Sequence, residues 1–146
     1  MAQDDDFSLD GFLPYLLSQA AAAVGRQFAA TYRDRYGMLN TEWRVLAHLG
    51  QQDGLTAKQI GTLAQVHKTK VSRAVAALEA KRFVARTTTD RDRRSASLTL
   101  TRAGRAAYWD LTGIARAHDR RLEKTLGPDA YAGLVSQLRQ LSGHGA

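Results

Sequence analysis

Apolar residues recur every three or four positions along the first long stretch of the chain, from about Pro14 to Tyr36. This spacing gathers them on one face of a helix, at Leu16, Leu17, Ala20, Val24, Phe28 and Tyr32. Pro14 suits a first helical turn, where its missing N–H costs nothing, and Gly37 is a typical helix stop. The pattern predicts one long helix, with residues 1–11 frayed ahead of it.

Three shorter stretches with helical spacing follow, and each comes directly after a residue whose side chain can accept a hydrogen bond from the first turn. They run over residues 42–51, 57–64 and 68–80, with Thr41, Thr56 and His67 as the expected caps. In the second of them we expect Ile60 and Leu63 to be buried. In the third, the apolar stripe consists of Val71, Ala74, Val75 and Leu78.

The spacing of apolar residues changes to two between residues 83 and 100, which is typical of strands. Two strands are predicted, over 83–89 and 95–100, joined by a turn with the sequence Asp-Arg-Asp-Arg-Arg. Helical spacing returns after the cap Thr101 and continues to about Leu126, and Pro128 opens a last helix. The apolar stripes of these two helices are Ala107, Leu111, Ile114, Leu122 and Leu126, then Tyr131, Leu134, Val135, Leu138 and Leu141.

Composition places this pattern in a single soluble domain. The chain has 146 residues, of which 44% are hydrophobic and 24% charged, as in ordinary globular proteins. No apolar run approaches the roughly 20 residues of a membrane span, and the acidic start of the chain is unlike a secretory signal. Cysteine is absent, which excludes disulfides and thiolate chemistry. We expect a cytoplasmic protein with no segment in a membrane.

Positive charge is concentrated in the middle third of the chain. Residues 56–105 hold 12 basic and 3 acidic side chains, a net charge of +9, whereas residues 1–55 carry −3 and residues 106–146 carry +1. A focused cationic segment between near-neutral flanks indicates a polyanionic partner. Charge alone leaves three alternatives open, which are nucleic acid, an anionic membrane surface and a solvated basic face.

The predicted helix over 68–80 narrows these alternatives, because its spacing separates an apolar face from a polar, cationic one. The polar face carries Thr69, Ser72 and Arg73, and Lys68 and Lys70 flank it. An α-helix fits the major groove of DNA, where an arginine can donate to both acceptors of a guanine edge. We expect Arg73 to read a base, whereas Thr69 and Ser72 are either base contacts or ordinary surface residues.

The turn of the predicted hairpin carries three arginines between two aspartates. An arginine on a protruding turn can enter a narrow minor groove, where the negative potential is strongest. We expect Arg91 or Arg93 to enter the groove and Arg94 to pair with Asp92 and stiffen the tip. Two short helices followed by such a hairpin describe a winged helix-turn-helix. For the tip of the hairpin, the alternative is a loose charged loop that does not contact DNA.

These motifs resemble the core of the MarR family of transcriptional regulators, and the resemblance covers roughly residues 12–142. The Val-Ser-Arg of the predicted recognition helix stands at residues 71–73, and the wing pattern of the family is met by Asp92, Arg94, Leu98, Leu100, Thr101 and Gly104. One departure concerns the position before the wing, where the family has glycine and this chain has Arg82. A non-glycine residue in a left-handed helix stop costs about 1 kcal/mol, and Arg82 becomes a further candidate phosphate contact.

The resemblance implies a winged helix-turn-helix lobe at residues 40–105, flanked by dimerisation helices at 12–37 and 106–142 in one domain over 1–146. It further implies a homodimer that binds double-stranded DNA at a pseudo-palindromic operator, usually as a repressor. In many members of the family a small, often aromatic, anionic effector releases the DNA. The candidate effector residues are Arg26 for a carboxylate, Trp43 for stacking, and His48. Ordinary core, surface or ion-pair roles are the alternatives for all three.

Other function classes find little support in the sequence. No Ser/His/Asp set, phosphate loop or zinc motif is present, so we do not expect an enzyme. The four histidines are scattered without ligand spacing, so we expect no metal site and no cofactor. An architectural or constitutive DNA-binding protein without an effector is the alternative function.

Overall fold

Helices make up most of the structure. The computed structural model describes residues 6–88 and 96–143. In chain order the elements are a short 3-10 turn η1 (Leu9–Gly11), α1 (Leu13–Tyr36), α2 (Asn40–Gln51), β1 (Leu55–Thr56), α3 (Ala57–Ala64), α4 (Lys68–Ala80), β2 (Val84–Thr87), β3 (Ser97–Leu100), α5 (Arg102–Leu126) and α6 (Pro128–Leu141). This order confirms the predicted fold class, a mainly helical chain with a winged helix-turn-helix core.

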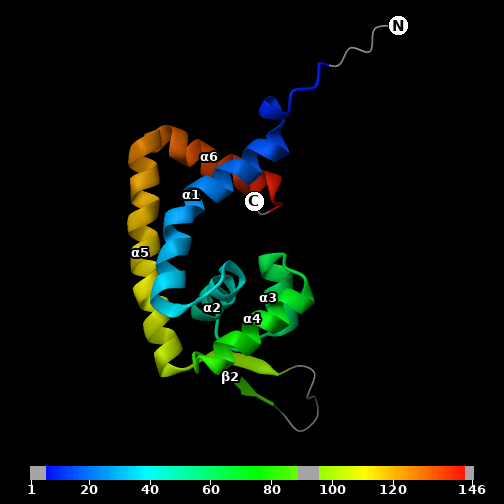
Figure 1. Cartoon of the computed structure of the whole chain (residues 1–146), viewed down its shortest axis with the longest axis vertical. Coiled ribbons are helices and arrows are strands. Elements are labelled where there is room, and N and C mark those ends of the chain that lie inside the picture. The colour runs from blue at the N-terminus through cyan, green and yellow to red at the C-terminus, as the bar shows by residue number, and fades with distance from the viewer. Residues whose placement is uncertain (1–5, 89–95, 144–146) are drawn as a thin grey trace, which may run out of the picture.

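The elements divide into two regions (Figure 1). α2, α3, α4 and the strands pack on one another at the lower end, together with the nearest parts of α1 and α5, and we call residues 32–111 the lobe. α1 and α5 run side by side upward from the lobe, and α5 leads into α6 at the upper end. We call the remaining parts of α1 and α5, together with α6, the outer helices.

The starts of α3, α4 and α5 follow from the predicted caps. The hydroxyl oxygen of Thr56 accepts the amide of Gln59, and that of Thr101 accepts the amide of Gly104. At the start of α4 the His67 ring nitrogen accepts the amide of Thr69 at 3.2 Å. These hydrogen bonds confirm three of the four predicted caps, because each satisfies an amide that the helix itself leaves open.

The predicted cap at Thr41 is wrong. α2 begins at Asn40, and Leu39 is the residue at the cap position. The carboxylate of Glu42 reaches back and accepts the amide of Leu39 at 3.2 Å. The helix start is therefore satisfied by an acidic side chain inside the first turn, which also suits the positive end of the helix dipole.

The sheet has three antiparallel strands in the order β1-β3-β2, one more than the predicted hairpin. Leu100 pairs with Val84 on one side of β3, and Leu98 pairs with Leu55 on the other. β1 has only two residues, too few to show an alternating pattern in the sequence. It nevertheless joins the start of α3 to the wing.

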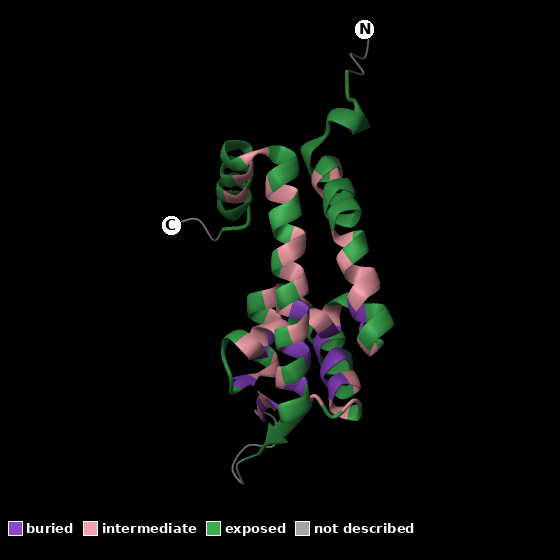
Figure 2. Cartoon of the chain, turned by 90° about the vertical axis from the view of Figure 1, so that its left-hand side faces the viewer, coloured by how far each residue is buried: buried purple, intermediate pink, exposed green. Residues whose placement is uncertain are grey.

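The hydrophobic core lies within the lobe (Figure 2). Its fully buried side chains come from α2, α3, α4, β3, α5 and the connection between α1 and α2, and include Met38, Val45, Leu46, Leu49, Ile60, Val71, Val75, Leu78, Leu98 and Leu111. Leu63 was expected among them, but its side chain is 48% exposed. α3 packs on α2 and α4 through Ile60, and Leu63 lies on its outward side.

The outer helices bury much less. Leu134, Leu138 and Leu141 on α6 are 42%, 40% and 63% exposed, and Leu16 and Val24 on α1 are similarly open. The predicted apolar stripes are thus present but not covered within one chain. No helix among residues 6–88 and 96–143 combines the length and apolar character that a membrane span requires.

Two positions at the base of the wing have special backbone requirements. Arg82 has a φ of 63°, which confirms the left-handed conformation that its place before the wing indicated. Gly104, at the start of α5, is pressed against the preceding chain, because a Cβ atom there would lie 2.0 Å from the carbonyl oxygen of Phe83. Only glycine leaves room for this approach.

Candidate nucleic-acid interface

The helix-turn-helix consists of α3, a short turn and α4. Gln65 ends α3 in the left-handed conformation, with a φ of 53°. The amide of Val66 then donates to the carbonyl of Gly61, and His67 caps α4. A Cβ atom at Gly61 would lie 3.1 Å from the carbonyl oxygen of Val66, so this glycine lets the turn pack closely on α3. These contacts set the angle between the two helices.

α4 presents the cationic face that the sequence predicts. Its apolar stripe is buried in the lobe, at Val71, Ala74, Val75 and Leu78. The opposite face is exposed and carries the five predicted DNA-contacting residues, Lys68, Thr69, Lys70, Ser72 and Arg73. The structure therefore brings these five side chains together on one free surface of a helix. That arrangement suits insertion into the major groove.

A groove between α3 and α4 extends this surface. It has a volume of about 590 Å³ and is lined by Ala57, Lys58, Gly61, Thr62, Val66, Lys68 and Ser72. Lys58 and Thr62 are absent from the predicted site, although their spacing of four residues places them on one exposed face of α3. A lysine and a hydroxyl are typical partners of DNA phosphates.

The cations of this surface are not neutralised by neighbouring acids. Lys58, Lys68, Lys70 and Arg73 form no ion pair with an acidic side chain among the described residues. An ion pair within the described residues joins Arg86 on the wing strand β2 to Glu79 on α4, at 2.8 Å. It holds the first wing strand against the recognition helix and leaves the face of α4 positively charged.

The predicted wing tip lies outside the described residues. This applies to Arg91, Arg93 and Arg94 and to the expected pairing of Arg94 with Asp92. The described part of the hairpin consists of β2, which ends at Thr87 and packs on α4, and β3, which begins at Ser97 (Figure 1). The role of the three arginines stays a prediction.

The three candidate effector residues do not come together through any contact among the described residues. Trp43 is partly buried and packs edge-on against Phe28, with ring centroids 5.1 Å apart. Arg26 is exposed on α1. Burial, followed by the charge of Arg44, lowers the pKa of His48. Within the described chain no cluster of three or more His, Cys, Asp or Glu side chains is suited to hold a metal ion.

Comparisons with known proteins agree with this geometry. Residues 36–95 match the sequence model of the MarR family. A MarR family transcriptional regulator from Silicibacter pomeroyi is 30% identical, with a TM-score of 0.82 over 94% of this chain and 98% of the other. The transcriptional repressor CouR, solved bound to a 23-mer DNA duplex, is 28% identical, with a TM-score of 0.81 over 92% of this chain and 94% of its own.

A third solved structure shares the fold at lower identity. Bordetella bronchiseptica BpsR, whose DNA binding is regulated by 6-hydroxynicotinic acid, is 22% identical, with a TM-score of 0.82 over 93% of this chain and 96% of the other. At this identity the likeness concerns the fold alone. The search of curated proteins found no match.

Proposed function

The chain belongs to the MarR family of transcriptional regulators, and from this premise we propose that it is a homodimeric repressor acting in the cytoplasm. It binds a pseudo-palindromic operator and is released from it by a small molecule. The observation that carries the DNA-binding part is the exposed, cationic face of α4, whose lysines and arginine have no acidic partner among the described residues.

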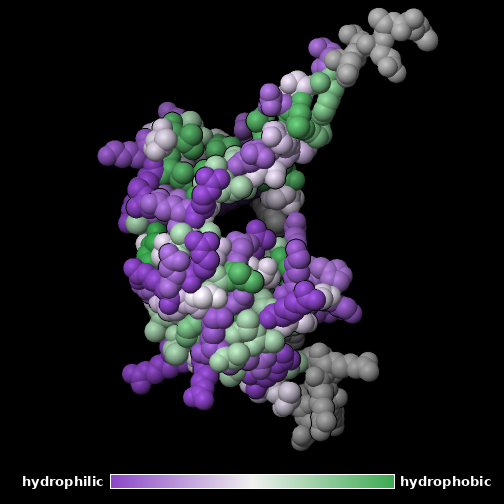
Figure 3. Space-filling model, in the orientation of Figure 1, coloured by the Kyte–Doolittle hydropathy of each residue, from purple (hydrophilic) through white to green (hydrophobic). Residues whose placement is uncertain are grey.

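The homodimer is supported by the apolar surface of the outer helices. Figure 3 shows hydrophobic side chains gathered at the upper end of the molecule, over the start of α1 and the region of α6. The exposed apolar side chains of this region are Phe7, Leu9, Phe12, Leu13, Leu16, Val24, Leu126, Leu134, Leu138 and Leu141. Large exposed apolar side chains gathered in this way mark an association site. A second copy offers the same surface and covers it with twofold symmetry.

Twofold symmetry determines the form of the operator. Two copies of α4 related by a twofold axis read two inverted half-sites about one turn of DNA apart. Occupancy of such a site blocks transcription, as the name of the 28% identical repressor CouR indicates for that protein. Lys58 and Thr62 would lie on phosphates beside each half-site, and Arg91 or Arg93 in the neighbouring minor groove.

Release by a small molecule is the second part of the proposal. BpsR, which shares the fold, has its DNA binding regulated by 6-hydroxynicotinic acid. We propose a small aromatic or carboxylate effector for this chain as well, with Arg26, Trp43 and His48 as the candidate contacts. The effector acts by favouring a state with lower affinity for the operator.

Selection of bound fragments from the source genome, followed by affinity measurements on the selected duplex and on random duplex, tests the proposal. A specific regulator binds the selected duplex about 10³-fold or more tightly. Equal affinities for both duplexes would favour an architectural protein instead. Repeating the measurement with candidate aromatic acids tests release, and light scattering on the free protein tests the dimer.

A further inference from the structure

The root of the wing, where the chain passes from α4 into β2, is held by contacts on both sides of Arg82. Arg82, with its left-handed φ of 63°, stands between the end of α4 and the start of β2. Its neighbours are Lys81 and Phe83, and each of them contacts the corner where α1 ends and α2 begins. The α1–α2 corner therefore contacts the residue directly before Arg82 and the residue directly after it, at the point where the chain turns into the wing.

Lys81 makes the first of these contacts. Its ammonium group lies 3.2 Å from a carboxylate oxygen of Glu42, at the start of α2. Glu42 is the one charged residue among the described ones that is buried, with 4% of its surface exposed. Its other carboxylate oxygen accepts the amide of Leu39. A buried carboxylate that has lost its cation carries a large free-energy cost, so this pair holds the end of α4 against α2.

Phe83 makes the second contact, through the ring of Tyr36 in the last turn of α1. The two ring centroids lie 5.8 Å apart in an edge-to-face arrangement, which is favourable for aromatic pairs. Phe83 is also fixed by its backbone, since its amide donates to the carbonyl of Leu78 and its carbonyl accepts the amide of Thr101. The position of Phe83 therefore sets where the wing leaves the lobe.

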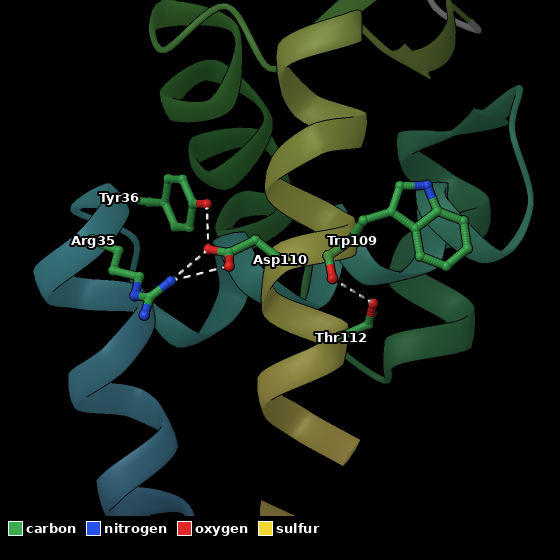
Figure 4. Close-up of polar contacts among 5 residues, drawn as sticks. All are labelled: Arg35, Tyr36, Trp109, Asp110 and Thr112. Atoms are coloured by element: carbon green, nitrogen blue, oxygen red, sulfur yellow. Dashed lines mark hydrogen bonds and ion pairs between the residues drawn. The ribbon is translucent and has the colours of Figure 1, made fainter. Parts of the chain in front are cut away.

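Tyr36 also contacts α5 (Figure 4). Its hydroxyl donates to a carboxylate oxygen of Asp110 at 2.6 Å. Arg35 donates to both oxygens of the same carboxylate at 3.0 Å. Trp109, the neighbour of Asp110, points to the other side of α5 and takes no part in the cluster. Tyr36 thus joins the two long helices to each other and, through its ring, to the root of the wing.

We propose that Tyr36 is a positioning residue for DNA binding, which keeps the wing and the recognition helix in a fixed position relative to α1 and α5. We call Tyr36, Glu42, Lys81, Phe83 and Asp110 the wing clamp. In a dimer built on α1, α5 and α6, this clamp sets the separation of the two recognition helices. The inference rests on the proposed homodimer and operator, and it adds the residue that makes the dimer selective for one half-site spacing.

The test compares duplexes that carry the same two half-sites with the central spacing changed by one base pair. Wild-type protein is expected to bind the selected spacing best. Tyr36→Phe keeps the ring contact with Phe83 and loses only the hydroxyl, so it should fold. We expect its preference for the selected spacing to fall by about threefold to tenfold. Asp110→Ala should lower the preference similarly, and the double variant should be no worse than either single one.

Arg105→Ala is the matched control. It removes the ion pair between Arg105 on α5 and Asp53 at 3.3 Å, which lies near the wing but outside the wing clamp, so the contacts of Tyr36 stay in place. We expect Arg105→Ala, at most, to weaken binding to every duplex alike, and to leave the preference for the selected spacing unchanged. An unchanged preference in Tyr36→Phe, or an equal loss in Arg105→Ala, would overturn the role of Tyr36. Absence of specific binding by the wild type, or of any spacing preference, would instead overturn the proposed dimeric function.

Discussion

The lobe and the outer helices bury their apolar residues in different ways. All described residues that are buried lie between Tyr32 and Leu111, within the lobe. The outer helices carry stripes of the same residue types, yet Leu134 and Leu138 are 42% and 40% exposed. Helical periodicity thus predicts an apolar face equally well in both regions. It does not tell whether the partner of that face belongs to the same chain.

The number of packed elements explains this difference. Three short helices, three strands and parts of α1 and α5 surround a single core in the lobe. α6 has one principal neighbour, α5, so most of its surface stays open. Apolar surface stabilises the folded protein only when it is removed from water, by about 25 cal/mol per Å² buried. The lobe obtains this stabilisation within one chain, whereas the outer helices obtain it from the proposed second copy.

The largest effect is expected from breaking the close packing of the lobe with Gly104→Ala. The added Cβ atom would lie 2.0 Å from a backbone oxygen, which cannot move without displacing the root of the wing. We expect the free energy of unfolding to fall by about 3 kcal/mol or more, measured by urea denaturation. Gly113→Ala on the same helix is the control, because nothing lies within 4 Å of its added Cβ atom. It should stabilise the protein by roughly 0.5–1 kcal/mol. Similar losses of unfolding free energy in both variants would contradict the expected difference in packing between the lobe and the outer helices.

The next largest effect is expected from Leu138→Asp in the outer helices. A charge in the middle of the apolar stripe should separate the copies, because burying it unpaired is costly. Operator affinity should then fall by about a hundredfold, since the second half-site is no longer held nearby. Light scattering reports the mass, and the circular dichroism of the lobe should persist. Leu39→Asp is the control at another exposed leucine, 68% exposed and outside the stripe. A dimer that survives Leu138→Asp contradicts the proposed interface.

Two substitutions on the DNA-facing side of the lobe should separate base reading from phosphate binding. Arg73→Ala should cost about 1–3 kcal/mol on the selected duplex and relax the preference at one base pair. Lys58→Ala should weaken binding to all duplexes alike and reduce the slope of log K against log salt by about one unit. Fluorescence anisotropy over a series of salt concentrations measures both. Equal losses on selected and random DNA would identify Arg73 as a phosphate contact only.

The smallest effect is expected from pH, at the tyrosine of the lobe that joins α1 to α5. Burial, followed by the hydrogen bond to Asp110, raises the pKa of Tyr36 to about 12, from 10.0. Protonated Tyr36 therefore stabilises the fold fully below about pH 10, and this contribution is lost as the pH rises toward 12. The stability difference between wild type and Tyr36→Phe should be constant up to about pH 9 and shrink above it. Denaturation at several pH values measures it.

Tyr131 offers the matching comparison in the outer helices. Its hydroxyl donates to Asp119, and this hydrogen bond raises the pKa of Tyr131. The pair is exposed, so water competes for it more than for the pair at Tyr36. We expect a smaller pH-dependent difference between wild type and Tyr131→Phe. A larger difference at Tyr131 than at Tyr36 would contradict the tighter packing of the lobe.

Much of the candidate site could be predicted from local patterns. The face of α4 follows from the alternation of Val71 and Val75 with Ser72 and Arg73, because a period of 3.6 residues fixes which side chains share a side. Lys58 and Thr62 were missed because the sequence does not show that the exposed face of α3 lies beside that of α4. The two faces form one groove only in the folded chain. Leu63 was misplaced for a related reason, since a helix of two turns has room for few inward residues.

The sequence by itself determined what depends on neighbours along the chain. These features are the helix bounds other than the start of α2, the caps at Thr56, His67 and Thr101, the cationic face of α4 and the left-handed Arg82. Only the tertiary structure decided the contacts between distant segments, among them the β1–β3 pairing, the groove between α3 and α4 and the wing clamp. Tyr36 and Asp110 are 74 residues apart, and Glu42 and Lys81 are 39 apart. No local periodicity encodes such pairs, because they form only once packing of the core has brought the helices together.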